Sequence, residues 1–195
     1  TIQRAGLWDV GVQRCVQISG PEAEKFMSML TPRNISNIKV GQCRYIVMTN
    51  QEGGVLNDPV MMRMAEDKFW LSTADSDMYL WTKGVACYSG HNVDIDTPAV
   101  YPLQIQGPRS HLIVASLFGD KVLDLKYYDW MKAEINGINV IISRTGYSSE
   151  VGFEIYILGY ERGDELYEAI MQAGKPFELA PGSPNRIRRI EGGVL

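Results

Sequence analysis

The chain has 195 residues and a formal net charge of −4, with 45% hydrophobic and 22% charged residues, which is the composition of an ordinary globular domain. The acidic balance excludes a general nucleic-acid binder, and no apolar run approaches the roughly 20 residues that a membrane span needs. No secretory signal is visible.

The cysteines and histidines point to no metal centre. Cys15, Cys43 and Cys87 are odd in number, far apart and without a Cys-x-x-Cys pair, which indicates neither a disulfide framework nor a zinc site. This usage fits a reducing cytosol. His91 and His111, the only histidines, stand in no recognisable nucleophile motif, so neither a histidine metal site nor a Ser-His-Asp triad is predicted.

The first elements are a strand and a helix. Alternating apolar residues from Val10 to Ile18 predict a half-buried strand. Gly20-Pro21 ends the strand and opens a helix, which Thr31-Pro32 stops. The residues expected to form the buried stripe of this helix are Ala23, Phe26, Met27 and Leu30.

A hairpin follows, with a break that carries an acidic residue. Gly53-Gly54 is a turn signal between two strand-like runs, Tyr45–Thr49 and Val60–Met64. Pro59 cannot donate to a sheet ladder, and it holds the residue before it extended, which fixes the direction of the Asp58 carboxylate. Asp58 is therefore a functional candidate, and a solvent-exposed turn residue is the alternative.

The chain continues with shorter elements. We expect a strand at Phe69–Ser72, a helix capped by Thr73 or Asp75 and closed at Ser89-Gly90, and strands at Val93–Ile95 and Tyr101–Gln106. The helix carries Met78, Trp81 and Val85 on one side.

A short internal sequence repeat suggests two related modules. Ile18-Ser19-Gly20-Pro21 and Ile105-Gln106-Gly107-Pro108 each end a strand and open a helix, 107 − 20 = 87 residues apart. The second helix is expected to bury Leu112, Ala115 and Leu117 or Phe118, and to end at Gly119. We interpret the repeat as two βαβ-type modules, about 1–98 and 99–195, although so short a match also arises by coincidence.

The last third adds more strands and one helix. Strands are predicted at Tyr127–Trp130, Val140–Arg144 and Gly152–Ile157, and a helix at Asp164–Ala173. Antiparallel and mixed strands with helices on one face predict an α+β fold.

Glu154 is the second carboxylate candidate. In a strand it shares a face with Gly152 and Tyr156, where the glycine leaves room for a flat ligand. A carboxylate accepts two hydrogen bonds from an amino-pyrimidinone edge. An exposed strand glutamate is the alternative.

Basic and aromatic residues complete the candidates. Arg186, Arg188 and Arg189 form the densest basic cluster and could hold a carboxylated substrate or the glutamyl tail of a cofactor, or simply a solvated helix face. Trp8 and Tyr147 each adjoin a polar residue and a turn, so they are candidates for a cation–π wall against a cationic substrate.

Several motifs, in order along nearly the whole chain, resemble the glycine cleavage T-protein (aminomethyltransferase) superfamily of folate-dependent enzymes. They are Leu7–Val10, Gly53–Asp58, Leu103–Pro108, Gly146–Glu154 and Arg189–Gly193. The resemblance implies a folate-binding T-protein-like fold with two ferredoxin-like βαβ modules that share mixed and antiparallel sheets. It also implies that the chain is the central part of a longer protein, without an N-terminal segment and a C-terminal barrel.

A finer resemblance concerns the subgroup. Asn57-Asp58 stands where the T-protein usually has Asp-Asp, Trp8 where it has Phe, and Ser148-Ser149 where it has Thr-Gly. Leu123–Tyr128 and Arg188–Gly193 resemble the dimethylsulfoniopropionate demethylases of marine bacteria. In that group a methyl leaves a sulfonium and joins tetrahydrofolate, giving 5-methyltetrahydrofolate and methylmercaptopropionate.

The resemblance also implies roles for single residues. Asp58 is similar to the catalytic aspartate and Glu154 to the pterin-binding glutamate, which would place a reduced pterin between residues 58 and 154. The further candidates for binding tetrahydrofolate are Asn57, Tyr147 and Arg186. The candidates for binding the substrate are Trp8, Arg188 and Arg189. The folate-contacting arginine of the T-protein falls at Asn185 in this chain, so the resemblance implies no arginine at that position for the folate tail.

Other functions remain open at this stage. They are a true aminomethyltransferase with a lipoyl-bound donor, a non-catalytic folate-binding module, and a demethylase for a methoxylated aromatic acid. The expected partners are folate and a small methyl donor, with no nucleic acid, no membrane and no metal, and homo-oligomerisation stays open.

Overall fold

The computed structural model describes residues 3–74, 77–184 and 186–193, without the side chains of Arg186, Arg188 and Arg189. The chain forms two compact units. Unit 1 consists of Thr1–Gly11 and Ala99–Leu195, and unit 2 of Val12–Pro98. The stretch before Gly11, which the sequence places in the first module, therefore belongs with the second, because its strand pairs with residues 103–106.

Unit 1 is built on a six-stranded sheet in the order β10-β11-β12-β9-β1-β13. Its pairs are antiparallel except for β1 with β13, so the sheet is mixed. The strands are β1 (Gly6–Asp9), β9 (Val100–Gln106), β10 (Trp130–Ile135), β11 (Ile138–Ser143), β12 (Gly152–Leu158) and β13 (Ala180–Gly182).

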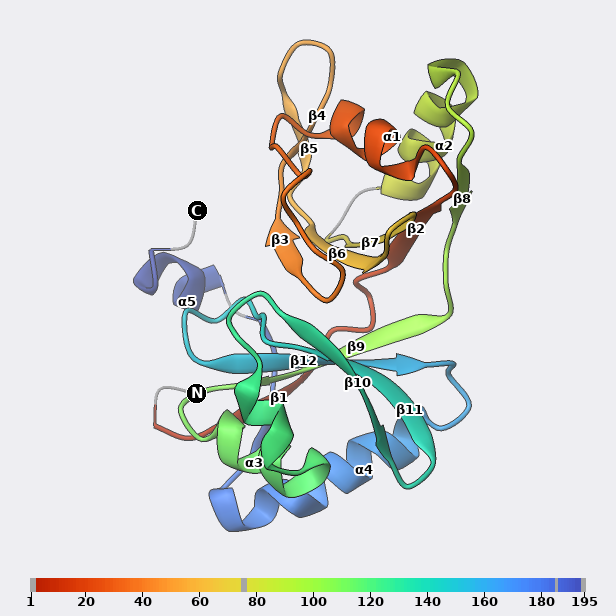
Figure 1. The fold of residues 1–195 in the computed structure, drawn as a ribbon. Coiled ribbons are helices and arrows are strands. Elements are labelled where there is room, and N and C mark those ends of the chain that lie inside the picture. The colour runs from red at the N-terminus through yellow and green to blue at the C-terminus, as the bar shows by residue number, and fades with distance from the viewer. Residues whose placement is uncertain (1–2, 75–76, 185, 194–195) are drawn as a thin grey trace. The chain divides into compact units, whose positions relative to one another are not determined.

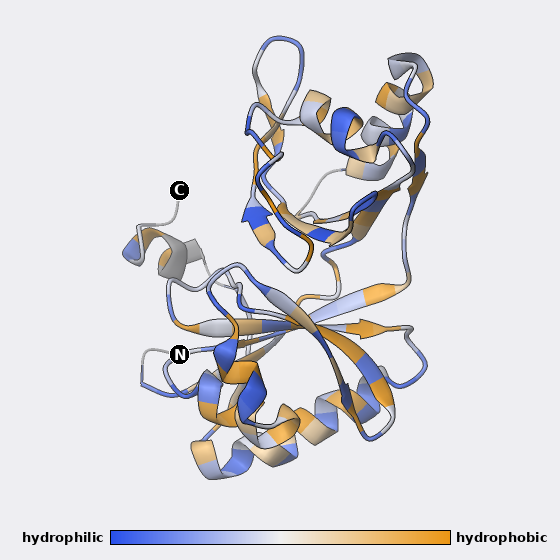
Figure 2. Cartoon of the chain, viewed as in Figure 1, coloured by the Kyte–Doolittle hydropathy of each residue, from blue (hydrophilic) through white to orange (hydrophobic). Residues whose placement is uncertain are grey.

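Helices cover one face of this sheet. α3 (Ser110–Phe118) and α4 (Gly163–Gly174) lie on the same side (Figure 1), and α4 alternates hydrophobic and hydrophilic residues (Figure 2). Leu166 and Ile170 of α4 pack into one core with Ile105 and Phe153 of the sheet. The remaining short elements are η1 (Asp120–Asp124), η2 (Lys175–Phe177) and α5 (Arg186–Glu191).

Unit 2 has a five-stranded sheet in the order β3-β6-β7-β2-β8 and a two-stranded β4-β5 ribbon. The strands are β2 (Cys15–Ser19), β3 (Cys43–Tyr45), β4 (Met48–Thr49), β5 (Val55–Asn57), β6 (Val60–Ala65), β7 (Lys68–Ser72) and β8 (Asp94–Asp96). The predicted hairpin is thus two ladders, β4 with β5 and β3 with β6, and the break falls at Asp58-Pro59 as expected from the proline.

The helices of unit 2 are α1 (Ala23–Leu30) and α2 (Met78–Ser89), which lie on one side of the five-stranded sheet (Figure 1). The stripe predicted for α1 is confirmed, since its four residues are all buried. The cap predicted for α2 is wrong: Asp77, whose side chain accepts from the Leu80 amide, is the N-cap, while Thr73 is buried and donates to the Arg14 carbonyl. Asp75 lies outside the described residues.

The two Gly-Pro segments share one backbone geometry. Gly20 and Gly107 both have φ of +126°, a region that favours glycine, and each glycine carbonyl accepts from an amide three residues on, at 3.0 and 2.9 Å. A strand therefore leads into a helix in the same way twice. The predicted α+β class with mixed and antiparallel sheets is confirmed.

A few predicted elements differ in detail. Val12 is 85% exposed because the strand begins only at Cys15. Leu112 faces solvent because α3 buries Ile113 and Val114 instead. Tyr127 precedes the strand, which starts at Trp130, since Tyr128 has φ of +66° and makes a turn. In the described part of the chain, no helix combines the length and apolarity needed to cross a bilayer.

Candidate functional site

The face of the six-stranded sheet opposite its helices carries a row of polar and aromatic side chains. Trp8, Gln104 and Glu154 lie directly opposite one another on the adjacent strands β1, β9 and β12. Their neighbours in each strand, such as Ile105 and Phe153, belong to the helix-covered core. Because successive side chains of a strand alternate between faces, the row points to the other side. The sequence prediction for the face of Glu154 is consistent with this register.

Glu154 is the centre of this row, and the structure surrounds its carboxylate with donors. Its side chain is 4% exposed. Gln104 Nε2 donates to Oε1 at 2.5 Å, Tyr156 OH donates to Oε2 at 3.1 Å, and Thr145 Oγ1 also donates to Oε2. The alternative of an exposed strand glutamate is wrong, because a carboxylate with three donors is built into the protein.

A second layer supports these donors. Ser143, opposite Glu154 on β11, places Oγ 2.5 Å from Thr145 Oγ1. Since the single hydroxyl proton of Thr145 is given to Glu154, Ser143 is the donor in this contact. The hydrogen bonds thus run in one direction, from Ser143 through Thr145 to the carboxylate.

Two opposing effects act on the acidity of Glu154. Burial raises the pKa of its carboxyl above the ordinary value, because a charge in a low-dielectric interior loses its hydration. The hydrogen bonds from Thr145, Tyr156 and Gln104 lower the pKa, and burial is the larger effect. Burying the charged form of Glu154 is thus unfavourable for stability. A buried carboxylate of this kind is typical of a residue retained for binding or catalysis.

Gln104 itself is incompletely satisfied. It is 1% exposed, and while its Nε2 serves Glu154, its Oε1 has no hydrogen-bond partner within the described part of the chain. A buried amide oxygen without a donor is unfavourable by about 1–3 kcal/mol. An acceptor of this kind beside a carboxylate suits a ligand that brings N–H groups.

Gln106 holds the loop that follows β11. Its Nε2 donates to the Thr145 carbonyl at 3.3 Å and its Oε1 accepts from Ser148 Oγ at 2.5 Å. A Cβ at Gly146 or Gly152 would overlap the Gln106 amide, so a side chain at either position would displace that amide from its hydrogen bonds. Tyr147, predicted to contact folate, is half-buried on this loop, between the two residues that Gln106 fixes.

Asp58 lies in unit 2, at the break between β5 and β6. It is half-buried, and Tyr45 OH donates to its Oδ2 at 2.8 Å. The Ile46 amide donates to the Pro59 carbonyl at 3.0 Å, so pairing resumes immediately after the aspartate. Asn57 precedes it at the end of β5 and is 3% exposed. The backbone on both sides of Asp58 is therefore fixed.

The structure brings some of the predicted site residues together and leaves others undescribed. Glu154 and Trp8 share one sheet face in unit 1, with Gln104 between them, while Asn57 and Asp58 are consecutive in unit 2. Trp8 is 2% exposed, and its indole packs against Gly6 and Gly182. The side chains of Arg186, Arg188 and Arg189, and the whole of Asn185, lie outside the described residues.

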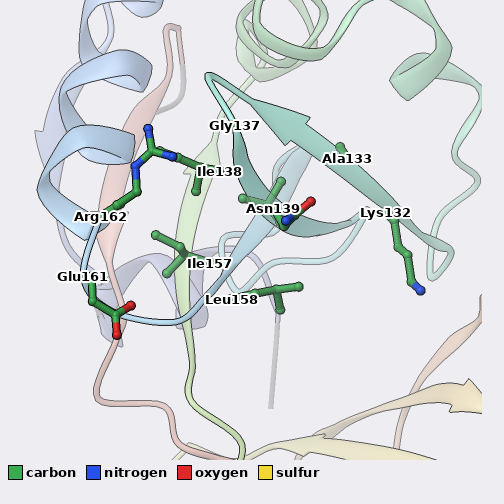
Figure 3. Close-up of a pocket in the computed structure, with 10 residues that line it drawn as sticks. Lys132, Ala133, Gly137, Ile138, Asn139, Ile157, Leu158, Glu161 and Arg162 are labelled. Atoms are coloured by element: carbon green, nitrogen blue, oxygen red, sulfur yellow. The ribbon is translucent and has the colours of Figure 1, made fainter.

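A surface pocket of about 450 Å³ lies elsewhere in unit 1, at the ends of β10, β11 and β12 (Figure 3). Ile138, Val140 and Ile157 line it, and none of the predicted site residues does. Its Arg162 is already engaged, with Nε 2.8 Å from Glu165 and Nη2 2.8 Å from the Asn136 carbonyl. The pocket is therefore separate from the Glu154 row. Among the residues that the structure describes, no group of three or more His, Cys, Asp or Glu could hold a metal ion.

Sequence reasoning missed the residues that support Glu154, namely Gln104 and Thr145. Thr145 gives no local signal, because its bond to Glu154 depends on a turn between strands. Gln104 had a signal in the sequence. The repeated segment includes a glutamine in both copies, Gln17 before Ile18 and Gln104 before Ile105, one residue ahead of the predicted repeat.

Comparison with solved structures defines the class. The glycine cleavage system aminomethyltransferase T of Bartonella henselae superposes with a TM-score of 0.79 at 25% identity, over 92% of this chain and 48% of that one. The fold is that of a glycine cleavage T-protein.

The chain belongs to the family described as the GCVT N-terminal domain, which it matches over residues 1–195. It is 38% identical to the dimethylsulfoniopropionate demethylase DmdA of Ruegeria pomeroyi over 189 residues, which are 97% of this chain and 52% of that protein. It is 31% identical to the aminomethyltransferase of Halalkalibacterium halodurans over 183 residues, which are 91% of this chain and 49% of that protein. The chain spans about half the length of these relatives, and the predicted resemblance is confirmed.

Proposed function

We propose that the protein containing this chain is a one-carbon transferase that moves a methyl group from dimethylsulfoniopropionate to tetrahydrofolate. The observation that carries the folate assignment is the buried Glu154 carboxylate, held by three donors on the sheet face opposite the helices. The higher identity to the demethylase, 38% against 31% for the aminomethyltransferase over similar lengths, favours the sulfonium donor.

The residues present fit a reduced pterin. Glu154 and the unpartnered Oε1 of Gln104 are adjacent acceptors, and the amino-pyrimidinone edge of a pterin presents N–H donors. The space over Gly152, which the sequence predicts to admit a flat ligand, is occupied by the Gln106 amide, so the fit rests on Glu154 and Gln104. We propose that this part of unit 1 binds and orients the pterin ring, with Tyr147 and Asn57 as further contacts.

When bound, tetrahydrofolate supplies the N5 that accepts the methyl group. A sulfonium methyl is already electrophilic, so the protein need not activate a leaving group. Holding donor and acceptor in line is then the main contribution, and it is worth several kcal/mol of the barrier. We assign Asp58 to orient the folate near N5 or N10 and to stabilise positive charge there, helped by the hydrogen bond from Tyr45. Trp8 is proposed to face the sulfonium, and Arg188 and Arg189 the substrate carboxylate, with Arg186 at the folate tail.

Product analysis tests this function. Intact protein is incubated with tetrahydrofolate and dimethylsulfoniopropionate, and 5-methyltetrahydrofolate and methylmercaptopropionate are quantified by mass spectrometry. Both products are expected in equal amounts, and only when both reactants are present.

The alternative within enzymes is an aminomethyltransferase, which the T-protein fold favours. It would leave dimethylsulfoniopropionate untouched and yield methylenetetrahydrofolate and ammonia from an aminomethyl-lipoyl carrier. A non-catalytic folate-binding module would bind tetrahydrofolate and turn over neither donor. Either result would overturn the demethylase assignment while leaving the pterin site standing.

A further inference from the structure

Gln104 and Glu154 form a two-acceptor pair on neighbouring strands. The residues are directly opposite in the β9–β12 ladder, and Gln104 Nε2 lies 2.5 Å from Glu154 Oε1. Three donors already occupy the carboxylate, two of them on Oε2. A carboxylate has about four lone-pair sites, so the remaining one is on Oε1, beside Gln104.

The Oε1 atom of Gln104 is the other acceptor. It is buried and has no partner within residues 3–74, 77–184 and 186–193. Native proteins rarely leave a buried amide oxygen without a donor, and each exception needs an explanation. A ligand N–H is the explanation that also accounts for its position next to a carboxylate.

The internal repeat provides a matched comparison. Gln17 of β2 stands where Gln104 stands in β9, each three residues before the glycine with φ of +126°. Trp70 lies opposite Gln17 in the register, as Glu154 lies opposite Gln104. In unit 2 the Trp70 indole Nε1 donates to Gln17 Oε1 at 2.9 Å. The equivalent amide oxygen thus accepts an N–H in unit 2, while in unit 1 no described residue donates to it.

We propose that Gln104 is a ligand-binding residue, whose Oε1 accepts a hydrogen bond from the 2-amino group of the pterin while Glu154 Oε1 accepts from the neighbouring N–H. The inference rests on the proposed binding of tetrahydrofolate and adds a second acceptor to it. The edge is then recognised by one charged and one neutral oxygen. Ligands that have lost the amino group are discriminated by Gln104, because its oxygen would remain buried without a donor.

The experiment compares two ligands, with and without the 2-amino group, in the wild-type protein and in variants. Dissociation constants are measured by calorimetry on the intact protein for tetrahydrofolate and for an analogue with a methyl in place of the 2-amino group. Gln104→Met keeps the chain length and removes the amide. Thr145→Val is the matched control, since it removes one donor to Glu154 and leaves the Gln104 oxygen in place.

The expected result is a loss of selectivity specific to Gln104. The wild-type protein should bind the analogue about 10-fold or more weaker than tetrahydrofolate, and Gln104→Met should reduce that ratio at least about 5-fold. Thr145→Val should weaken the binding of both ligands by the same factor, so the ratio of their dissociation constants should stay at the wild-type value.

An unchanged ratio in Gln104→Met would overturn the proposal, since Gln104 would then act only through Glu154. Equal wild-type binding of both ligands would overturn it without any variant, so a folding defect in Gln104→Met does not block the test. Failure of wild-type protein to bind tetrahydrofolate would instead overturn the proposed function.

Discussion

The two Gln-Ile-x-Gly-Pro segments have the same backbone and different chemistry. Each runs along a strand, turns at a glycine with φ of +126° and enters a helix. In unit 2 the residue opposite Gln17 is Trp70, whose indole N–H donates a hydrogen bond to the glutamine oxygen. In unit 1 it is Glu154, and the pair keeps a buried charge and an unpartnered oxygen in the described structure.

This difference separates what the fold requires from what a ligand requires. The glycine turn and the apolar helix contacts recur because the strand-to-helix connection needs them. A buried carboxylate is not needed for that connection, since unit 2 makes it with a tryptophan. The strand-to-helix connection therefore does not account for the chemistry of the Glu154 row.

The largest expected effect separates the two carboxylates by role. Asp58→Asn should lower kcat about 100-fold or more and change the dissociation constant of tetrahydrofolate little, because the amide keeps the size and loses the charge near the reacting atoms. Steady-state kinetics and calorimetry measure the two quantities. Glu52→Gln, on the exposed turn of the same hairpin, is the control and should behave as wild type. Unchanged kcat/KM in Asp58→Asn would remove the aspartate from catalysis.

Glu154→Gln should show the reverse pattern. Loss of the charged acceptor should raise the dissociation constant of tetrahydrofolate about 100-fold, which corresponds to charged hydrogen bonds worth roughly 1.5–3 kcal/mol. The same titration on Trp70→Phe, the equivalent position of unit 2, should give the wild-type constant. Equal weakening in both variants would mean that the effect is general to the sheets and not specific to the Glu154 row.

Gly152→Ala should destabilise the protein by about 1–3 kcal/mol, because the added methyl overlaps the buried Gln106 amide. At the equivalent position of unit 2 the chain has Lys68, which shows that the strand itself tolerates a side chain there. Chemical denaturation gives the difference in unfolding free energy. A Gln106→Ala background should remove much of the penalty, and a penalty that persists there would point to another cause.

Trp70→Phe should cost about 1–2 kcal/mol of unfolding free energy, since it creates in unit 2 the unpartnered glutamine oxygen that unit 1 already has. Adding Gln17→Met should recover most of the loss, because both partners are then apolar. The double-mutant cycle measures the coupling between the two residues. Additive losses would indicate that the indole contributes by packing alone.

The last prediction is a pH dependence. Burial raises the pKa of Glu154 in the folded state above its ordinary value of 4.5, so the folded state holds that proton more tightly than the unfolded state. Stability from this group is therefore greatest at low pH and declines as pH rises from about 4.5 through the raised pKa. Glu154→Gln lacks this decline, so its unfolding free energy relative to wild type should increase with pH across that window. Denaturation at several pH values would contradict this if the difference stayed constant.

Much of the fold could be predicted because its signals are local. The stripe of α1, the break at Pro59 and the two Gly-Pro turns depend on neighbours in sequence, and the structure bears them out. The face of α3 was mispredicted because nearly all of its residues are apolar, so periodicity could not distinguish Leu112 from Ile113.

The candidate site was predictable only in part. Alternation along one strand placed Glu154 on a face with Gly152 and Tyr156. Its donors Gln104 and Thr145 come from another strand and a turn, 50 and 9 residues away, and only the ladder register brings them to the carboxylate. The limited space at Gly146 also depends on a distant side chain, that of Gln106.

A crystal structure of the intact protein with tetrahydrofolate tests the central claim most directly. The account predicts the amino-pyrimidinone edge against Glu154, with ligand nitrogens about 2.7–3.2 Å from Glu154 Oε1 and Gln104 Oε1. A pterin ring bound away from these two oxygens, with Gln104 Oε1 still lacking a donor, would contradict it.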